Sequence, residues 1–169
     1  HFLNSESALR KIIEAAELSA GNTILEIGPG TGILTRKLLE SGATIVAVEK
    51  DQRACDLLQK QFEDKIADGK LILKNADILE INVADLLLKE GSYSIVANIP
   101  YYITGAILEK FLEYSPRPSK MVLLVQKEVA DRIVAKDEKE SILSISVKAF
   151  GQPKLVAKVP KGAFLPPPK

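Results

Sequence analysis

The sequence predicts one α/β domain over residues 1–169, with a mostly parallel, seven-stranded sheet covered by helices on both faces. Two observations support this fold class. Short apolar runs alternate along the chain with segments of helical periodicity, which is the pattern of βαβ units. The apolar runs are rich in Ile, Val and Leu with little polar alternation, as expected for strands buried on both faces.

The first five strands and the helices around them follow from these patterns. The strands are expected at residues 23–27, 44–48, 71–73, 94–97 and 121–125. Helices are expected where apolar residues recur every three or four positions and so form one stripe. The three clearest stripes are Leu9, Ile12, Ile13 and Ala16, then Ala54, Leu57, Leu58 and Phe62, and finally Ile107, Leu108, Phe111 and Leu112.

The end of the chain predicts an antiparallel hairpin at the edge of the sheet. Residues 142–150 and 155–159 are both apolar and of strand length. The short link Gly151, Gln152 and Pro153 between them is typical of a turn. These two segments bring the expected number of strands to seven.

Composition limits the class of protein. With 169 residues, of which 46% are hydrophobic and 27% charged, the chain is long enough to bury its own core. A single cysteine, Cys55, excludes an intrachain disulfide and a cysteine-based zinc site. No apolar run approaches the roughly 20 residues of a membrane span. We therefore expect a soluble, cytoplasmic monomer that needs neither a metal nor a membrane.

The ends of the sequence suggest a piece of a longer protein. The chain starts at His1 without an initiator Met and stops at Lys169, directly after three prolines. No signal-peptide pattern opens it, but a mitochondrial targeting segment before His1 would not be visible. We therefore expect residues 1–169 to be part of a longer protein.

Charge is distributed unevenly although the whole chain has a net charge of only +1. Residues 1–115 carry 12 Lys and Arg against 17 Asp and Glu, whereas residues 116–169 carry 11 against 5. A basic region attracts a polyanion by releasing its condensed counterions. The C-terminal third is therefore consistent with nucleic-acid binding, although lysines on an ordinary solvated surface explain the same charge.

A glycine loop follows the first predicted strand. The sequence Glu26-Ile-Gly28-Pro-Gly30-Thr-Gly32 lets the main chain turn tightly and leaves amides at the helix start free for a ligand. Glu49 comes 21 residues after Gly28, where a carboxylate can accept both hydroxyl protons of a ribose. This spacing predicts an adenosine-containing cofactor. A dinucleotide loop would need its third glycine at Ile33, which disfavours a dehydrogenase.

The end of the third strand carries a further candidate for this site. In the stretch Asn75-Ala76-Asp77-Ile78, the Asp77 carboxylate could accept the exocyclic amine of an adenine while Ile78 packs on the ring. A helix cap is the alternative role for Asp77. Because carboxyl ends of parallel strands meet at one edge of the sheet, we expect Asp77 to lie beside the glycine loop and Glu49.

The turn after the fourth strand, Asn98-Ile99-Pro100-Tyr101, predicts the chemistry. An adenine amine is a poor nucleophile because its lone pair is delocalised into the ring. The Asn98 side-chain oxygen and the Ile99 carbonyl could accept its two protons and direct the lone pair at a methyl donor. Pro100 stiffens the turn and Tyr101 could stack on an extruded base. A simple strand-ending turn is the alternative interpretation.

Taken together, these motifs resemble the rRNA adenine dimethyltransferase family of class I, Rossmann-like methyltransferases. The resemblance covers the whole chain. It is carried by HFL at 1–3, EIGPGTG at 26–32, Glu49, Asp77, NIPYY at 98–102, LVQKEVA at 124–130 and FLPPPK at 164–169.

The resemblance implies an S-adenosylmethionine-dependent enzyme, with residues 1–169 as its catalytic domain. It also implies an N-terminal arm and a C-terminal helical domain that these residues do not include. Members of the family dimethylate the N6 amines of two adjacent adenosines of small-subunit rRNA during ribosome biogenesis, so the implied partner is this rRNA in the pre-ribosomal small subunit. Phe164 would flank the flipped base opposite Tyr101, or else seal the core. The implied cofactor contacts are His1, Leu3, Gly28, Gly30, Glu49, Lys50, Asp77, Ile78 and Asn98.

Two alternatives stay open within this fold. A related methyltransferase of large-subunit rRNA, which confers antibiotic resistance, would use the same cofactor, although residues 126–130 fit the small-subunit branch better. A non-catalytic nucleic-acid-binding assembly or transcription factor could retain the fold. We expect such a factor to have lost Glu49 or the Asn98 turn, and both are present here.

Overall fold

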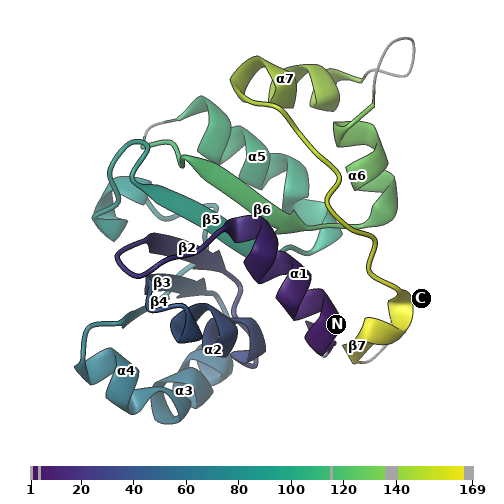
Figure 1. The fold of residues 1–169 in the computed structure, drawn as a ribbon. Helices are drawn as coiled ribbons and strands as arrows, with labels where there is room; N and C mark the ends of the chain where they lie inside the picture. The colour runs from purple at the N-terminus through teal and green to yellow at the C-terminus, as the bar shows by residue number, and fades with distance from the viewer. Residues whose placement is uncertain (1, 4, 115, 136–140, 166–169) are drawn as a thin grey trace.

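The structure is a computed structural model that describes residues 2–3, 5–114, 116–135 and 141–165. Its elements follow one another as strand and helix, as Figure 1 shows. The strands are β1 (Phe2–Leu3), β2 (Thr23–Ile27), β3 (Thr44–Glu49), β4 (Leu71–Asn75), β5 (Tyr93–Asn98), β6 (Lys120–Leu124) and β7 (Phe164–Leu165). The α-helices are α1 (Glu6–Ala16), α2 (Ile33–Glu40), α3 (Gln52–Gln61), α4 (Glu63–Ala67), α5 (Thr104–Glu113), α6 (Lys127–Ile133) and α7 (Ile142–Phe150). Short 3-10 turns lie at η1 (Val83–Leu86), η2 (Tyr101–Ile103) and η4 (Lys161–Ala163).

Five strands form one parallel sheet in the order β4-β3-β2-β5-β6. The first strand of the series, β2, lies at the centre, and successive strands are added first on one side and then on the other. The order therefore reverses between β2 and β5. Open α/β sheets bind their ligands at such a switch point, outside the carboxyl ends of the strands.

Each face of this sheet is buried under helices, which confirms the expected Rossmann-like architecture. Alternate residues of a strand enter different cores: Ile24 packs with α1 and α2, whereas the adjacent Leu25 packs with α5. In α1 the buried residues include Leu9 and Ile12, as the helical stripe predicted. Burial on both faces explains why the strands are uninterrupted apolar runs.

The predicted edge hairpin is wrong in its first half, because residues 142–150 form helix α7. The error came from treating an apolar stretch of strand length as a strand, and residues 143–149 also alternate polar and apolar side chains like a half-buried strand. A capping box at Ser141 and Ser144 starts the helix instead. The helix buries Ser144 and Val147 and leaves Ile145 57% exposed, so the period-two pattern does not match what is buried.

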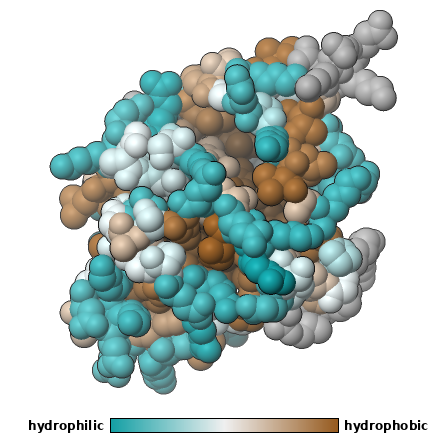
Figure 2. Space-filling model, viewed as in Figure 1, coloured by the Kyte–Doolittle hydropathy of each residue, from teal (hydrophilic) through white to brown (hydrophobic). Residues whose placement is uncertain are grey.

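The second half of that hairpin, residues 155–159, has no regular secondary structure. A strand needs a hydrogen-bonded partner, and its expected partner is a helix. The segment instead runs alongside β6 and helps to line a groove of about 430 Å³ between α1, β6, α6 and α7. Figure 2 shows hydrophobic residues exposed in the upper part of the molecule. Large exposed apolar side chains of this part of the sequence include Ile142, Ile145 and Val156.

The ends of the described chain meet in a pairing that the sequence did not predict. Strands β1 and β7 form a separate two-stranded antiparallel sheet, in which Phe2 is opposite Leu165 and Leu3 opposite Phe164. Two-residue strands are too short to produce a periodic pattern. Among the described residues, no helix has the length and hydropathy to cross a membrane.

Candidate active site

The predicted site residues come together at the carboxyl edge of the parallel sheet. Gly28 follows β2, Glu49 is the last residue of β3, and Asn98 is the last residue of β5. Asp77 lies two residues beyond the end of β4. Parallel register between these strands brings residues far apart in sequence to one edge. The site therefore lies at the switch point of the sheet.

The glycine loop has a left-handed backbone at Gly28, Gly30 and Gly32, with φ of +66°, +55° and +78°. This conformation disfavours residues with a Cβ. A Cβ on Gly28 would meet nothing within 4 Å, whereas a Cβ on Gly32 would lie 2.7 Å from the Phe62 ring. Gly28 therefore leaves open space beside the main chain, while Gly32 allows α3 to pack closely.

Glu49 ties this loop to the start of the next helix. One carboxylate oxygen accepts the Gly30 amide at 3.0 Å and the other accepts the Asp51 amide at 2.9 Å. Each oxygen has a second lone pair, so the carboxylate can still accept hydroxyl protons. The loop and the predicted ribose acceptor thus form one hydrogen-bonded unit before any ligand is considered.

Asp77 and Lys50 form an ion pair across adjacent strand ends. The Lys50 ammonium donates to one Asp77 oxygen at 2.7 Å, and the Leu79 amide donates to the other at 2.9 Å. The Lys50 contact, followed by the Leu79 amide, lowers the pKa of Asp77, which keeps it a carboxylate. The Leu79 contact closes a turn over residues 78–80, but no helix starts at Asp77, so the helix cap considered for this residue is not formed. The turn leaves a charged acceptor beside Ile78, which is buried.

Hydrogen bonds to main-chain atoms hold the turn that follows Asn98. The Ile99 amide donates to the Leu124 carbonyl at 3.1 Å, and the Pro100 carbonyl accepts from the Ile103 amide and the Thr104 hydroxyl. The Ile99 side chain is buried in the core beneath the turn. These contacts fix the turn between β5, β6 and α5.

Glu26, the fourth residue of β2, is buried two residues before Gly28. Its side chain is 1% exposed, and neither carboxyl oxygen has a hydrogen-bond partner within the described part of the chain. Burial raises the pKa of Glu26 to about 8, and the Glu49 charge adds to this effect. The sequence placed Glu26 in the glycine motif but gave no reason to expect a neutral acid.

The remaining predicted residues lie outside the strands of the parallel sheet or outside the described residues. His1 lies outside the described residues. Leu3 is in β1, and Tyr101 begins η2 directly after the Asn98 turn. Phe164 is partly buried and packs against the core that contains α1 and α2. Its role as a base-stacking residue stays a prediction.

Two further residues, Asn75 and Lys110, contact the candidate site although no sequence pattern indicated a role for them. Asn75, the last residue of β4, donates its side-chain amide to the carbonyls of Glu49 and Lys50 at 3.0 and 3.2 Å. Lys110, on α5, donates to two carbonyls of the loop after Asp77. Both depend on contacts between residues more than 20 positions apart, which a local pattern does not encode.

The sequence is similar to proteins of one known family. A family model described as ribosomal RNA adenine dimethylase matches residues 1–169. Curated relatives named ribosomal RNA small subunit methyltransferase A include one from Dehalococcoides mccartyi, 44% identical over the whole chain, and one from Nostoc, also 44% identical over the whole chain. The chain spans 57% and 65% of the length of these two relatives.

Two solved structures of similar proteins cover the whole chain. A dimethyladenosine transferase from Plasmodium falciparum is 32% identical with a TM-score of 0.85, over 100% of this chain and 60% of that one. The 23S rRNA methyltransferase ErmE is 28% identical with a TM-score of 0.85, over 100% of this chain and 66% of that one. The match of the family model over every residue shows that the chain belongs to the ribosomal RNA adenine dimethylase family.

Proposed function

We propose that this protein transfers methyl groups from S-adenosylmethionine to the N6 amines of two adjacent adenosines in small-subunit rRNA. It would act as a monomer on the pre-ribosomal small subunit, in the cytoplasm of a bacterial cell like those of its curated relatives. The observation that carries the proposal is the meeting of the glycine loop, Glu49, Asp77 and the Asn98 turn at one edge of the sheet.

The residues present fit an adenosyl cofactor. Gly28 leaves space for close approach to the main chain, and the Glu49 carboxylate is already held in place by two amides. We assign the ribose hydroxyls to Glu49, and the adenine to Asp77 and Ile78, with Lys50 holding the Asp77 carboxylate in its charged form. His1, Leu3, Gly30 and Asn98 complete the proposed contacts. When bound, S-adenosylmethionine supplies an electrophilic methyl group on a sulfonium centre.

The Asn98 turn would prepare the acceptor amine. The Asn98 side-chain oxygen and the Ile99 carbonyl are assigned to its two N–H protons, because the Pro100 carbonyl is already taken by Ile103 and Thr104. Accepting both protons localises the nitrogen lone pair and orients it toward the methyl group. Tyr101 and Phe164 are proposed to stack on the extruded base.

The transfer needs no general base within the turn. As the nitrogen–carbon bond forms, the carbon–sulfur bond breaks and the amine becomes positively charged. Its proton is then acidic and passes to solvent. The role of Asn98 and Ile99 is thus to position the amine by hydrogen bonds.

Small-subunit rRNA is favoured over the large-subunit alternative by the relatives. The curated relatives named for the small subunit are 44% identical to this chain, whereas ErmE is 28% identical. A non-catalytic factor is disfavoured because Glu49 and Asn98 are both in place at the ends of their strands. A dehydrogenase is disfavoured because Ile33 starts α2 where a dinucleotide loop would need glycine.

Calorimetry on the full chain, combined with a methyl-transfer assay on small-subunit particles, tests the proposal. Glu49→Gln should weaken S-adenosylmethionine binding at least tenfold, because the amide cannot accept from both the loop and the ribose as a carboxylate does. Asn98→Ala should lower the rate of methyl transfer roughly 100-fold, because the amine loses one of its two acceptors. Glu63→Ala, an exposed acid at the start of α4, is the matched control.

The outcomes separate the alternatives. No binding of S-adenosylmethionine by the folded wild-type chain would overturn the proposal. Binding without transfer to small-subunit particles, but with transfer to large-subunit rRNA, would favour the ErmE-like activity. Binding with no transfer to either RNA would favour the non-catalytic factor.

A further inference from the structure

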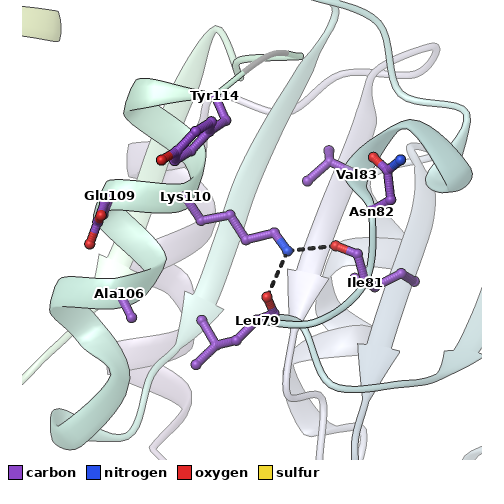
Figure 3. A pocket seen from close by; sticks show the side chains of 8 residues that line it. All are labelled: Leu79, Ile81, Asn82, Val83, Ala106, Glu109, Lys110 and Tyr114. Atoms are coloured by element: carbon purple, nitrogen blue, oxygen red, sulfur yellow. Dashed lines mark hydrogen bonds between the residues drawn. The ribbon is translucent and has the colours of Figure 1, made fainter.

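A lysine of α5 reaches across to the loop that follows β4. The Lys110 ammonium donates to the Leu79 carbonyl at 3.0 Å and to the Ile81 carbonyl at 2.5 Å. Figure 3 shows the side chain extending from α5 toward these two carbonyls through a pocket of about 410 Å³. These contacts join Lys110 to residues that are 31 and 29 positions earlier in the sequence.

The loop that Lys110 holds is built on Asp77. The Asp77 carbonyl accepts the Glu80 and Ile81 amides at 3.0 and 2.9 Å, and its side chain accepts the Leu79 amide. The Ala76 amide still donates to the Glu49 carbonyl at 3.0 Å, and residues 77–81 then leave the sheet. Their position relative to the sheet is therefore set by this turn, by the buried Ile78 and by the contacts from Lys50 and Lys110.

The strength and direction of this contact suit a positioning role. Hydrogen bonds from an ammonium group are stronger than those between neutral groups. Lys110 is partly buried, which lowers its pKa, while the nearby Asp77 charge raises it. Asp77 in turn accepts a hydrogen bond from Lys50, the residue after β3. Two cations thus contact the loop, one directly after β3 and one on α5.

The helix that carries Lys110 also follows the Asn98 turn directly. The turn leads through η2 into α5, and the Thr104 hydroxyl at the start of the helix donates to the Pro100 carbonyl. Helix α5 therefore joins the proposed acceptor-amine turn at one end to the Asp77 loop at its middle. A shift of the loop away from α5 would move Asp77 relative to the Asn98 turn.

We propose that Lys110 is a positioning residue that holds the Asp77 loop for recognition of the adenine amine of the cofactor. This inference rests on the proposed function, since it assumes that Asp77 accepts that amine. It adds a residue of α5, outside the glycine loop and the strand ends, to the cofactor site. Lys110 touches neither cofactor nor substrate in this role.

Ligand selectivity separates a positioning role from a merely structural one. S-adenosylhomocysteine has the adenine amine, whereas S-inosylhomocysteine has a carbonyl oxygen in its place and so lacks the exocyclic donor assigned to Asp77. Calorimetry on the full chain would measure both ligands with wild type, Lys110→Met and Lys110→Arg. Lys148→Met is the matched control, because Lys148 on α7 also donates to a backbone carbonyl, that of Ala135.

Lys110→Met should weaken S-adenosylhomocysteine binding roughly tenfold and change S-inosylhomocysteine binding less than twofold. Lys110→Arg should restore most of the selectivity, because a guanidinium can donate to both carbonyls. Lys148→Met should leave the ratio of the two affinities at its wild-type value. Equal weakening of both ligands, or no weakening of either, would overturn the role of Lys110. Failure of the wild type to bind S-adenosylhomocysteine would overturn the proposed function itself.

Discussion

Glu26 should make the stability of this protein depend on pH in the direction opposite to that of an ion-paired acid. Its pKa is raised from 4.5 to about 8 because the carboxyl is buried. Between these two values the folded chain binds more protons than the unfolded chain, so the free energy of unfolding falls as pH rises. The stabilising contribution of the neutral acid is complete below pH 4.5 and is lost as pH rises through about 8.

The size of this effect follows from the two pKa values. Their difference corresponds to about 5 kcal/mol between the protonated and ionised forms in the folded state. Most of it falls between pH 5 and 9, where linkage predicts a loss of about 4 kcal/mol. That loss is a large share of the 5–15 kcal/mol that is typical of a folded domain.

Urea unfolding of wild type and Glu26→Gln at steps from pH 5 to pH 9 measures this contribution. Glutamine has nearly the same shape and does not ionise, so the difference between the two proteins isolates Glu26 from the other titrating groups. We expect Glu26→Gln to gain about 4 kcal/mol relative to wild type over this range. If the difference in free energy of unfolding between the two proteins stayed constant from pH 5 to pH 9, a neutral, buried Glu26 would be refuted.

Two further predictions concern the glycine loop and helix α7, which was expected to be a strand. Gly32→Ala should lower the free energy of unfolding by about 3 kcal/mol, because a Cβ would clash with Phe62 in a left-handed backbone. Gly69→Ala, with φ of +69° and no atom within 4 Å of a Cβ, should lose only about 1 kcal/mol; equal losses in urea unfolding would contradict the clash. Ser141→Ala should cost about 1 kcal/mol by removing the capping box with Ser144, and an unchanged melting temperature would argue against that cap.

Much of the sheet could be predicted from the sequence because of how it is buried. Residues of β2 alternate between two cores, so that every position is apolar except Thr23 and Glu26. Such runs identify a strand and its approximate ends. The predicted site followed from topology, since parallel strands place their carboxyl ends at one edge.

The region after β6 could not be predicted in the same way. In residues 143–149 polar and apolar residues alternate without interruption, which is the pattern of a strand. Helix α7 forms because its capping box and its packing through Val147 outweigh that pattern. Once α7 is helical, residues 155–159 lack the neighbouring strand that their apolar sequence would pair with.

The roles of side chains that contact residues far away in the sequence could not be predicted from local sequence patterns either. Lys110 looks like any solvated helix lysine in the sequence, and Asn75 looks like a residue at the end of a strand. Their roles depend on which carbonyls lie within reach, namely those of Leu79 and Ile81 for Lys110. Only the folded arrangement of α5 against the loop after β4 supplies that information.

The features that oppose stability gather where the cofactor is proposed to bind. Within the described residues, the buried side-chain oxygens without a hydrogen-bond partner belong to Glu26 and Thr35, which lie on either side of the glycine loop. A buried polar atom without a partner costs stability, and an apolar residue of similar size at position 26 would remove that cost. The fold therefore buries an ionisable side chain, Glu26, two residues before Gly28, where packing alone does not require one. Local cost of this kind is expected at a functional site rather than in a purely structural core.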